Sequence, residues 1–498
     1  MGFDKMMTEL ENEYVQLIFE IYPNLATVYG IPKSGYNDFT YDGISKNILK
    51  LEKLLKKVKI KSTENQTNIH LINSLELSIF ELKSISHYRY SAFYYYLMSF
   101  RSLLILLEDS NYYKNGVNDR VIESRINEFP DVIDKAIHEM EQKELSDSDL
   151  LYTLCLVKRD KVFIEKKVEN SQEGHSLQRI SLSMEKFLKF LTSRIKNDTK
   201  KKKFCSLGAD SLIEYVNKIT HWNISYQDIE KLYAEALDNI EVNKEHNIFS
   251  VENRGNSVDC SKEMLLECLQ EIYSKSKYVF GKDENIIEGL KFIDTKNDKY
   301  MFGNFQYIGS SLADPNDNSY LIYSSKNNVG CMEQFKLKMV HEIYPGHHYM
   351  KRYFTLKNQK NLYEMIRINQ YIEEGWAKYC EFFYANELDR SEKMKQSFRD
   401  NLTLMSIMFV IAIDIHFKEK RIIKIQEQLI GKCGLTKKII NSMILSLNVD
   451  ADRGLSYYIG YNYFYNFIKN KKTNKQLINF VNEILENSLI QGKENIYE

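Results

Sequence analysis

The chain contains 498 residues, of which 43% are hydrophobic and 13% aromatic. This composition supplies enough apolar side chains for a sizeable core, and it excludes both wholesale disorder and a small disulfide-stapled scaffold. Lys and Arg total 68, as do Asp and Glu. The balanced charge gives no overall attraction to nucleic acid or to an anionic membrane, so neither is expected as a partner.

The cysteines and the first residues indicate a reducing compartment. The seven cysteines are scattered and form no CxxC pair, which argues against a disulfide framework. Residues 1–14 carry acidic side chains where a signal peptide would need an uninterrupted apolar core. We therefore expect a cytoplasmic protein.

Long stretches of the chain have apolar residues three or four positions apart, which predicts α-helices. Residues 48–55 and 228–237 are examples, and only five prolines and 20 glycines interrupt the whole sequence. Ser225 and Asp228 have the spacing of a capping box at the start of the second helix. We expect one mainly α unit over residues 1–498, with an N-terminal helical part (1–220) and a second part (221–498) that carries a metal site.

Residues 300–329 break this pattern, because they are rich in Tyr, Gly, Ser, Asn and Asp and contain alternating apolar positions. They predict a small β-sheet of two or three strands beside the active-site cleft. Residues 402–417 are strongly apolar but contain Asp414 and His416. They are too short and too polar to cross a bilayer, so a buried helix with partners for both ionisable groups is expected.

The most informative segment begins at His341 and Glu342, as does the zinc-peptidase motif HExxH. The standard motif fails because the fourth position after His341 is a proline, followed by a glycine. His347 and His348 come next. If the Pro-Gly pair bulges out as a two-residue insertion, His347 takes the place of the second histidine, although spacing alone leaves His348 open as the ligand. The alternative is that Pro-Gly, a common stop signal, ends the helix and leaves the histidines on the surface.

A catalytic zinc normally takes three protein ligands and leaves one position for water. Glu374 lies next to a glycine and a tryptophan and is favoured as the third ligand over its neighbour Glu373. Ala377, on the same helix face as Glu374, is small enough to let that helix approach the His341 helix. Near the C-terminus, residues 451–465 combine tyrosines with Arg453; a tyrosine can donate to an oxyanion and an arginine can hold a carboxylate.

Three motifs together resemble a bacterial family catalogued as domain of unknown function eight-eight-five. They are HEIYPGHH (341–348), EGWAKYCE (374–381) and GLSYYIG (454–460). A fourth similarity, PNLATVYG (23–30), extends the resemblance over nearly the whole chain. The resemblance implies a large helical, metallopeptidase-like fold of the zincin type with a glutamate as third ligand. It implies His341, His347 and Glu374 as zinc ligands, Glu342 as general base and Tyr457 as oxyanion donor.

The surroundings of these motifs depart from the family pattern. Ala451 and Asp452 replace a Pro-Gly pair before the third motif, and Ala412 and Asp414 stand where the family has Asp and Gly. We therefore expect the metal site to match that of the family more closely than the substrate preference does. We expect His348 and Arg453 to contact the substrate, although an ion pair between Arg453 and a neighbouring aspartate is an alternative.

The leading functional hypothesis is a zinc metallopeptidase or amidohydrolase that cleaves an amide bond in a short peptide or peptide-like metabolite. Glu342 would act as its general base. One alternative is a tailoring enzyme of peptide-derived natural products that forms or cleaves an unusual amide. Another is a noncatalytic helical scaffold that binds the metal. The oligomeric state is not predicted.

Overall fold

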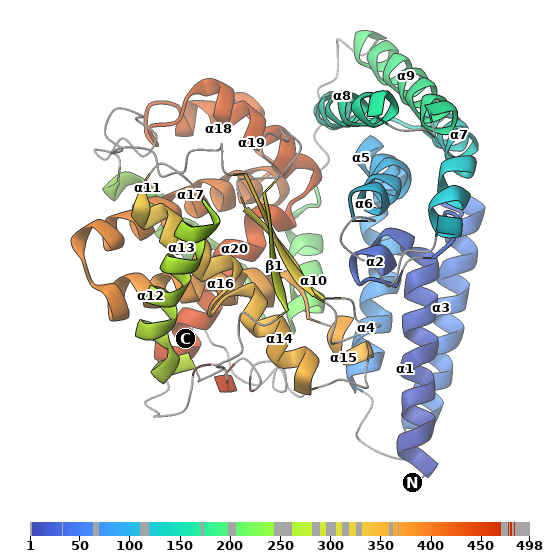
Figure 1. Ribbon diagram of the computed structural model, residues 1–498. Coiled ribbons are helices and arrows are strands. Elements are labelled where there is room, and N and C mark those ends of the chain that lie inside the picture. Colours follow the sequence, from blue (N-terminus) through green and yellow to red (C-terminus); the bar gives the residue numbers. More distant parts are fainter. Residues whose placement is uncertain are drawn as a thin grey trace. The chain divides into compact units, whose positions relative to one another are not determined.

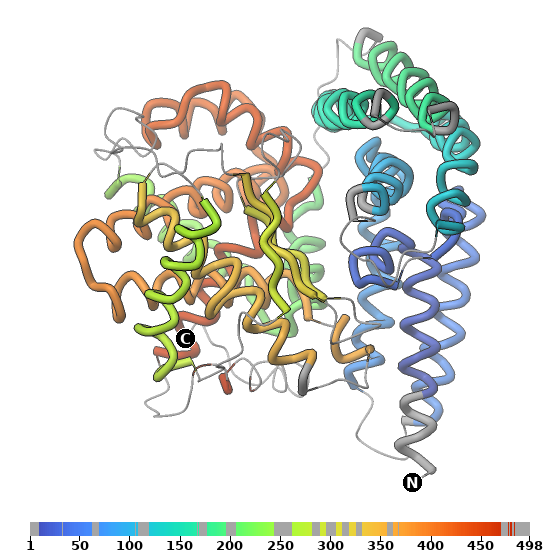
Figure 2. The backbone as a smooth tube through the Cα atoms, in the orientation of Figure 1, coloured from blue at the N-terminus to red at the C-terminus, as the bar shows by residue number. Residues whose placement is uncertain are grey.

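The computed structural model divides into two compact units. Unit 1 contains Met1–Cys205 with two short later segments, Ser311–Pro315 and Lys360–Glu364, and unit 2 contains the remainder. Figure 2 traces the chain through both. The boundary expected at residue 220 coincides with the end of a helix inside unit 2. The structure describes residues 2–31, 33–62, 69–109, 119–170, 174–197, 206–243, 261–280, 289–294, 305–310, 318–324, 331–357, 362–366, 368–469, 477, 479–480 and 483.

All the secondary-structure elements described in unit 1 are helices, and α1 and α3 lie side by side (Figure 1). Helix α1 packs against α3, and α9 packs against both α7 and α8. The α-helices are α1 (Gly2–Ile21), α2 (Pro23–Val28), α3 (Tyr41–Ser62), α4 (Ile69–Phe80), α5 (Ala92–Tyr96), α6 (Ser102–Asp109), α7 (Asp119–Glu141), α8 (Asp147–Asn170) and α9 (Gly174–Asn197). Short π or 3₁₀ turns between them are η2 (Glu81–Ile85), η3 (His87–Arg89) and η4 (Leu97–Arg101).

An arginine lies fully buried in the core of unit 1. Arg125, on α7, has no exposed surface. Its guanidinium donates to the backbone carbonyls of Ser102 at 2.6 Å, Pro23 at 3.1 Å and Lys33 at 2.9 Å. A buried charge needs hydrogen-bond partners, and here backbone oxygens from three separate segments provide them.

Unit 2 holds a three-stranded sheet and most of the remaining helices. Its helices are α10 (Ala209–Thr220), α11 (Tyr226–Val242), α12 (Lys262–Phe280), α13 (Met332–Glu342), α14 (His347–Lys357), α16 (Gln370–Phe383), η6 (Tyr384–Asp389), α17 (Glu392–His416), α18 (Ile422–Leu429), α19 (Lys437–Val449) and α20 (Asp452–Lys469). Residues of α15 (Leu362–Ile366) fall in both units. The predicted capping box is confirmed at α11, where the side chains and backbone N–H groups of Ser225 and Asp228 bond reciprocally.

The sheet has the strand order β1-β3-β2. Strand β3 (Ser319–Tyr323) pairs in parallel with β1 (Leu290–Asp294) and antiparallel with β2 (Phe305–Ile308). All five residues of β3 are buried, as expected for the central strand. The mainly α fold with a small sheet is confirmed, although β1 lies before the region in which the sheet was predicted.

Helix α17 runs through the core of unit 2, as its apolar sequence predicted, and its two ionisable groups have partners. Asp414 accepts a hydrogen bond from the Tyr233 hydroxyl at 2.7 Å and forms an ion pair with Lys420 at 2.8 Å. His416 Nε2 lies 2.7 Å from the carbonyl oxygen of Leu447. Among the described residues, no helix is both long enough and apolar enough to cross a membrane.

Candidate metal centre

The two histidines of the site lie on different helices. Helix α13 ends at Glu342, residues 343–346 form a turn with a cis bond before Pro345, and α14 begins at His347. The turn requires glycine at position 346, because a Cβ atom on Gly346 would overlap the carbonyl oxygen of His341. The expected bulge within one continuous helix is therefore wrong in detail: the helix stops and a new one starts.

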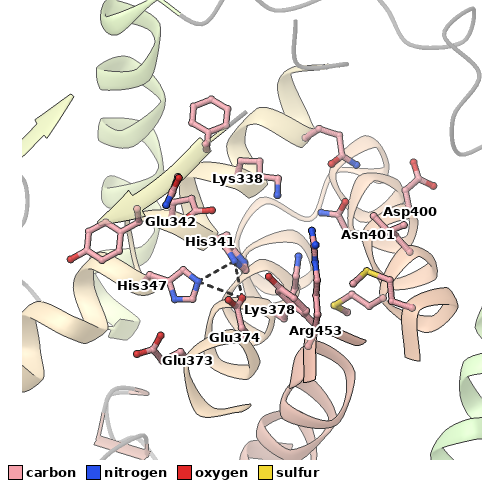
Figure 3. Close-up of a pocket in the computed structure, with 18 of the residues that line it drawn as sticks. Lys338, His341, Glu342, His347, Glu373, Glu374, Lys378, Asp400, Asn401 and Arg453 are labelled. Carbon is pink, nitrogen blue, oxygen red and sulfur yellow. Dashed lines mark hydrogen bonds and ion pairs between the residues drawn. The ribbon is translucent and has the colours of Figure 1, made fainter. Parts of the chain in front are cut away.

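This turn brings His341 and His347 together. Their Nε2 atoms are 3.2 Å apart, and the nearer carboxylate oxygen of Glu374 lies 3.3 Å from the first and 3.5 Å from the second (Figure 3). His348 points elsewhere: it is buried, and its Nδ1 lies 3.2 Å from the Tyr307 hydroxyl. Within the described residues, His341, His347 and Glu374 form the one group of three side chains that could hold a metal ion.

Helix α16, which carries Glu374, approaches α20 closely. A Cβ atom on Gly375 would lie 2.5 Å from the backbone of Gly460, so both helices need glycine at this contact. The indole of Trp376, fully buried, donates to the carbonyl oxygen of Pro345 at 2.8 Å. This bond ties α16, and with it Glu374, to the turn between the histidines.

A second carboxylate lies behind His341. Glu381 is buried, and one of its oxygens lies 2.8 Å from His341 Nδ1 and 2.7 Å from the ammonium of Lys378. Asn401 on α17 donates to its other oxygen at 2.9 Å. A carboxylate on the outer nitrogen of a ligating histidine fixes the orientation of the ring and leaves Nε2 free for a metal.

The charges in this cluster support one another in the metal-free state. Burial alone would raise the pKa of Glu374, but the two imidazoles hold it well below its usual range. Burial likewise opposes the ionisation of Glu381, yet Lys378 and His341 lower its pKa to about 2. The pKa of His341 is raised because its hydrogen bonds to both carboxylates outweigh burial and the nearby Lys378. Both carboxylates are thus anionic at neutral pH.

The three ligand atoms fit a zinc ion. A tetrahedral zinc with bonds of about 2.0 to 2.2 Å places its ligand atoms about 3.3 to 3.5 Å apart, close to the 3.2, 3.3 and 3.5 Å separations of this site. The Glu374 oxygen that faces the imidazoles is buried, and it lies 3.3 and 3.5 Å from their two Nε2 atoms. A metal ion would satisfy it.

A pocket of about 590 Å³ opens from the site. Strand β2 lies along it, so the small sheet borders the cleft as predicted. Glu342, Tyr457 and Arg453 also line the pocket, whereas His348 does not. The pocket is lined by Phe305, Gln306, Tyr307, Gln334, Lys338, His341, Glu342, His347, Lys351, Glu373, Glu374, Lys378, Asp400, Asn401, Leu404, Met405, Met408, Arg453 and Tyr457.

The hydroxyl of Tyr457 is held neutral beside the ligands. Burial raises its pKa well above the usual value, and the charges of Glu374 and Glu342, with a hydrogen bond to Glu374, raise it further. Arg453 is exposed, and it forms no ion pair with Asp450 or Asp452 in the described structure. Its backbone N–H reaches Asp450 at 3.3 Å, and its guanidinium lies 3.4 Å from the Ser446 hydroxyl.

Sequence reasoning overlooked the role of Glu381. The signal was present, because Glu374 and Glu381 are seven residues apart and therefore lie on one face of α16, two turns from each other. Lys378, four residues after Glu374, lies on that face as well. Asn401 could not have been found in this way, because it is contributed by a different helix and nothing in the local pattern links it to the site.

Comparisons with known proteins find the fold but no named activity. No family model matches the sequence, and no curated protein matches it. The chain is similar to a solved structure described as a "putative lipoprotein of unknown function" from Shewanella oneidensis, at 12% identity and a TM-score of 0.68, covering 96% of this chain and 99% of that one. It is also similar to a "putative lipoprotein" from Colwellia psychrerythraea, at 12% identity and a TM-score of 0.70, covering 96% and 95%.

These neighbours correct the functional prediction. These two solved proteins are each described as a "putative lipoprotein", one of them of unknown function, and neither description names a peptidase. The predicted cleavage of an amide bond is therefore wrong as an assignment. The resemblance to the eight-eight-five family rests on the motifs alone and stays a prediction, as does the cytoplasmic location.

Proposed function

We propose that this chain is a metal-binding protein that holds one zinc ion through His341, His347 and Glu374. The observation that supports this most strongly is the triangle of ligand atoms, whose sides of 3.2, 3.3 and 3.5 Å match a tetrahedral zinc. Two imidazoles and one carboxylate are also a common ligand set for zinc with an open fourth position. His341, His347 and Glu374 all line the pocket, so a fourth ligand would reach a bound ion from there.

The polar groups around this position determine what the centre can do. Bound zinc supplies a Lewis acid that lowers the pKa of water to about 7. Glu342 lines the pocket next to His341 and has a carboxylate that can accept a proton, while Tyr457 offers a neutral hydroxyl as donor. Catalysis at this site stays a prediction that rests on Glu342 and Tyr457, and we assign no reaction to it.

Metal analysis of protein purified without chelators tests the proposal. We expect about one zinc per chain. His341→Ala, His347→Ala and Glu374→Ala should each lose most of it, because two protein ligands hold the ion far less tightly than three. His348→Ala is the matched control and should retain the zinc, since this ring contacts Tyr307 instead.

Two results would contradict the proposed ligands. If wild-type protein with intact helical content holds no zinc even after incubation with the metal, the site is not a zinc centre. If His348→Ala empties the site while His347→Ala leaves it filled, the ligand set is wrong. Glu342→Gln and Tyr457→Phe should both keep their zinc, because neither residue belongs to the set.

A further inference from the structure

Three cations of the pocket lie on one side of the metal ligands, although Asp400 lies on that side as well (Figure 3) and Lys351 pairs with Glu373 on the other. Figure 3 shows Lys338, Lys378 and Arg453 on one side of His341, and Glu342 and Glu373 on the other. The three cations come from α13, α16 and α20, so residues far apart in the sequence build one basic wall.

Two of these cations form no close ion pair among the described residues, although Lys338 acts on Glu381 and Arg453 on Asp450 over a longer distance. Lys378 is held by Glu381 at 2.7 Å, and on the opposite side Lys351 pairs with Glu373 at 3.2 Å. By contrast, Lys338 and Arg453 are exposed, line the pocket and form no ion pair within the described part of the chain. An arginine has five N–H donors, and within the described residues the guanidinium of Arg453 uses one of them, to the Ser446 hydroxyl at 3.4 Å.

The wall of the pocket next to the basic groups is apolar. Leu404, Met405 and Met408 project from α17 into the same cavity. Methionine side chains are flexible and adapt to aliphatic groups of different shape. A ligand that fills this space therefore combines an anionic group with a short aliphatic body.

We propose that the pocket binds a small aliphatic carboxylate, with its carboxylate held by Arg453 and Lys338 and a second donor group at the open position of the zinc. This inference rests on the proposed zinc site. A guanidinium forms paired hydrogen bonds with a carboxylate. A phosphate would place two charges on the group held by Arg453 and Lys338, where a carboxylate places one, so repulsion by Asp400 in the same pocket disfavours it.

Calorimetric titration of the zinc-loaded full chain with glutarate and its monoamide, glutaramate, tests the inference. Glutarate has a carboxylate for the zinc and one for the cations, whereas glutaramate lacks one of the two charges. We expect glutarate to bind at least about tenfold more tightly, since hydrogen bonds between charged groups contribute about ten- to hundredfold in affinity. Arg453→Gln and Lys338→Gln should each lower the affinity for glutarate about tenfold. Each should also reduce the difference in affinity between glutarate and glutaramate.

The matched control is Lys336→Gln. It removes the same charge from the same helix, but Lys336 pairs with Glu271 at 2.7 Å and does not line the pocket. It should leave glutarate affinity unchanged. All variants are compared at equal zinc content and equal helical content by circular dichroism, so a folding defect is seen directly.

The failure of this inference differs from failure of the zinc site. Absence of zinc from the wild type would refute the metal centre. Full zinc with equal affinity for glutarate and glutaramate, or with glutarate affinity unchanged in both cation variants, would refute the carboxylate site alone. Tighter binding of inorganic phosphate than of glutarate would also overturn it, in favour of a phosphorylated ligand.

Discussion

Substitution of Glu381 by glutamine isolates the contribution of the carboxylate behind His341. Glutamine keeps the size of the side chain and one oxygen for His341 Nδ1, but removes the charge. In the wild-type protein, the Glu381 carboxylate accepts three hydrogen bonds, of 2.8, 2.7 and 2.9 Å, from His341, Lys378 and Asn401. The zinc ligands themselves are untouched, so any loss of metal affinity acts through the orientation and basicity of His341.

The expected loss in zinc affinity is ten- to hundredfold, or about 1.4 to 2.7 kcal/mol, as is typical for partners of ligating histidines. Folding should suffer as well. Lys378, whose side chain is 9% exposed, would keep its charge without a carboxylate partner. Breaking a buried ion pair costs up to about 3 to 5 kcal/mol, and we expect the lower end because Lys378 borders the pocket and can reach water.

Competition with a chelator of known affinity measures the zinc dissociation constant, and thermal unfolding of the metal-free protein measures stability. Glu373→Gln is the control. It makes the same change on the same helix, but the Glu373 carboxylate pairs with Lys351 and not with a histidine. Adding Lys378→Met to Glu381→Gln should restore much of the stability, but not the zinc affinity. Zinc affinity in Glu381→Gln within twofold of that in Glu373→Gln would refute the reasoning.

Three further predictions concern other parts of the structure. As the pH is lowered, zinc affinity should begin to fall above pH 6.5, the ordinary pKa of histidine, because the raised pKa of His341 lets protons compete with the metal at a higher pH. An onset below pH 6.5 in a pH series of zinc titrations would contradict this. Gly460→Ala should lower the free energy of unfolding by about 1 to 3 kcal/mol, since its Cβ would collide with the backbone of α16; unchanged denaturant unfolding would show that the helices can separate at no cost. Ser225→Ala should cost about 1 kcal/mol through loss of the capping box, with Ser225→Thr retaining most of it in the same thermal measurement.

Features that depend on neighbours in the sequence could be predicted. The capping box at Ser225 and the buried helix with Asp414 and His416 follow from local spacing and from the energetic cost of unpaired buried groups. Two short motifs carry all three candidate ligands, although spacing alone left His348 open beside His347 and the full set came from the family resemblance. The path of the turn at Pro345 was not predicted, because helical periodicity cannot describe a segment where the helix ends.

Features that depend on tertiary contacts lay beyond the sequence. Nothing near Gly375 indicates that Gly460, 85 residues later, packs against it. Strand β1 was missed because it lies before the Tyr- and Gly-rich region, and its pairing with β3 is long-range. The amide substrate was mispredicted for a related reason: the two motifs indicate a metal, whereas other residues that line the pocket come from α13, α17 and α20 together.

The guanidinium of Arg125 has a consequence for how unit 1 opens. One side chain satisfies carbonyl groups from the segments around Pro23, Lys33 and Ser102. Detachment of any one segment leaves a buried cation short of acceptors, so the other two are weakened at the same time. Amide protons in these three stretches should therefore exchange with solvent in one shared opening event, with similar free energies, instead of fraying independently.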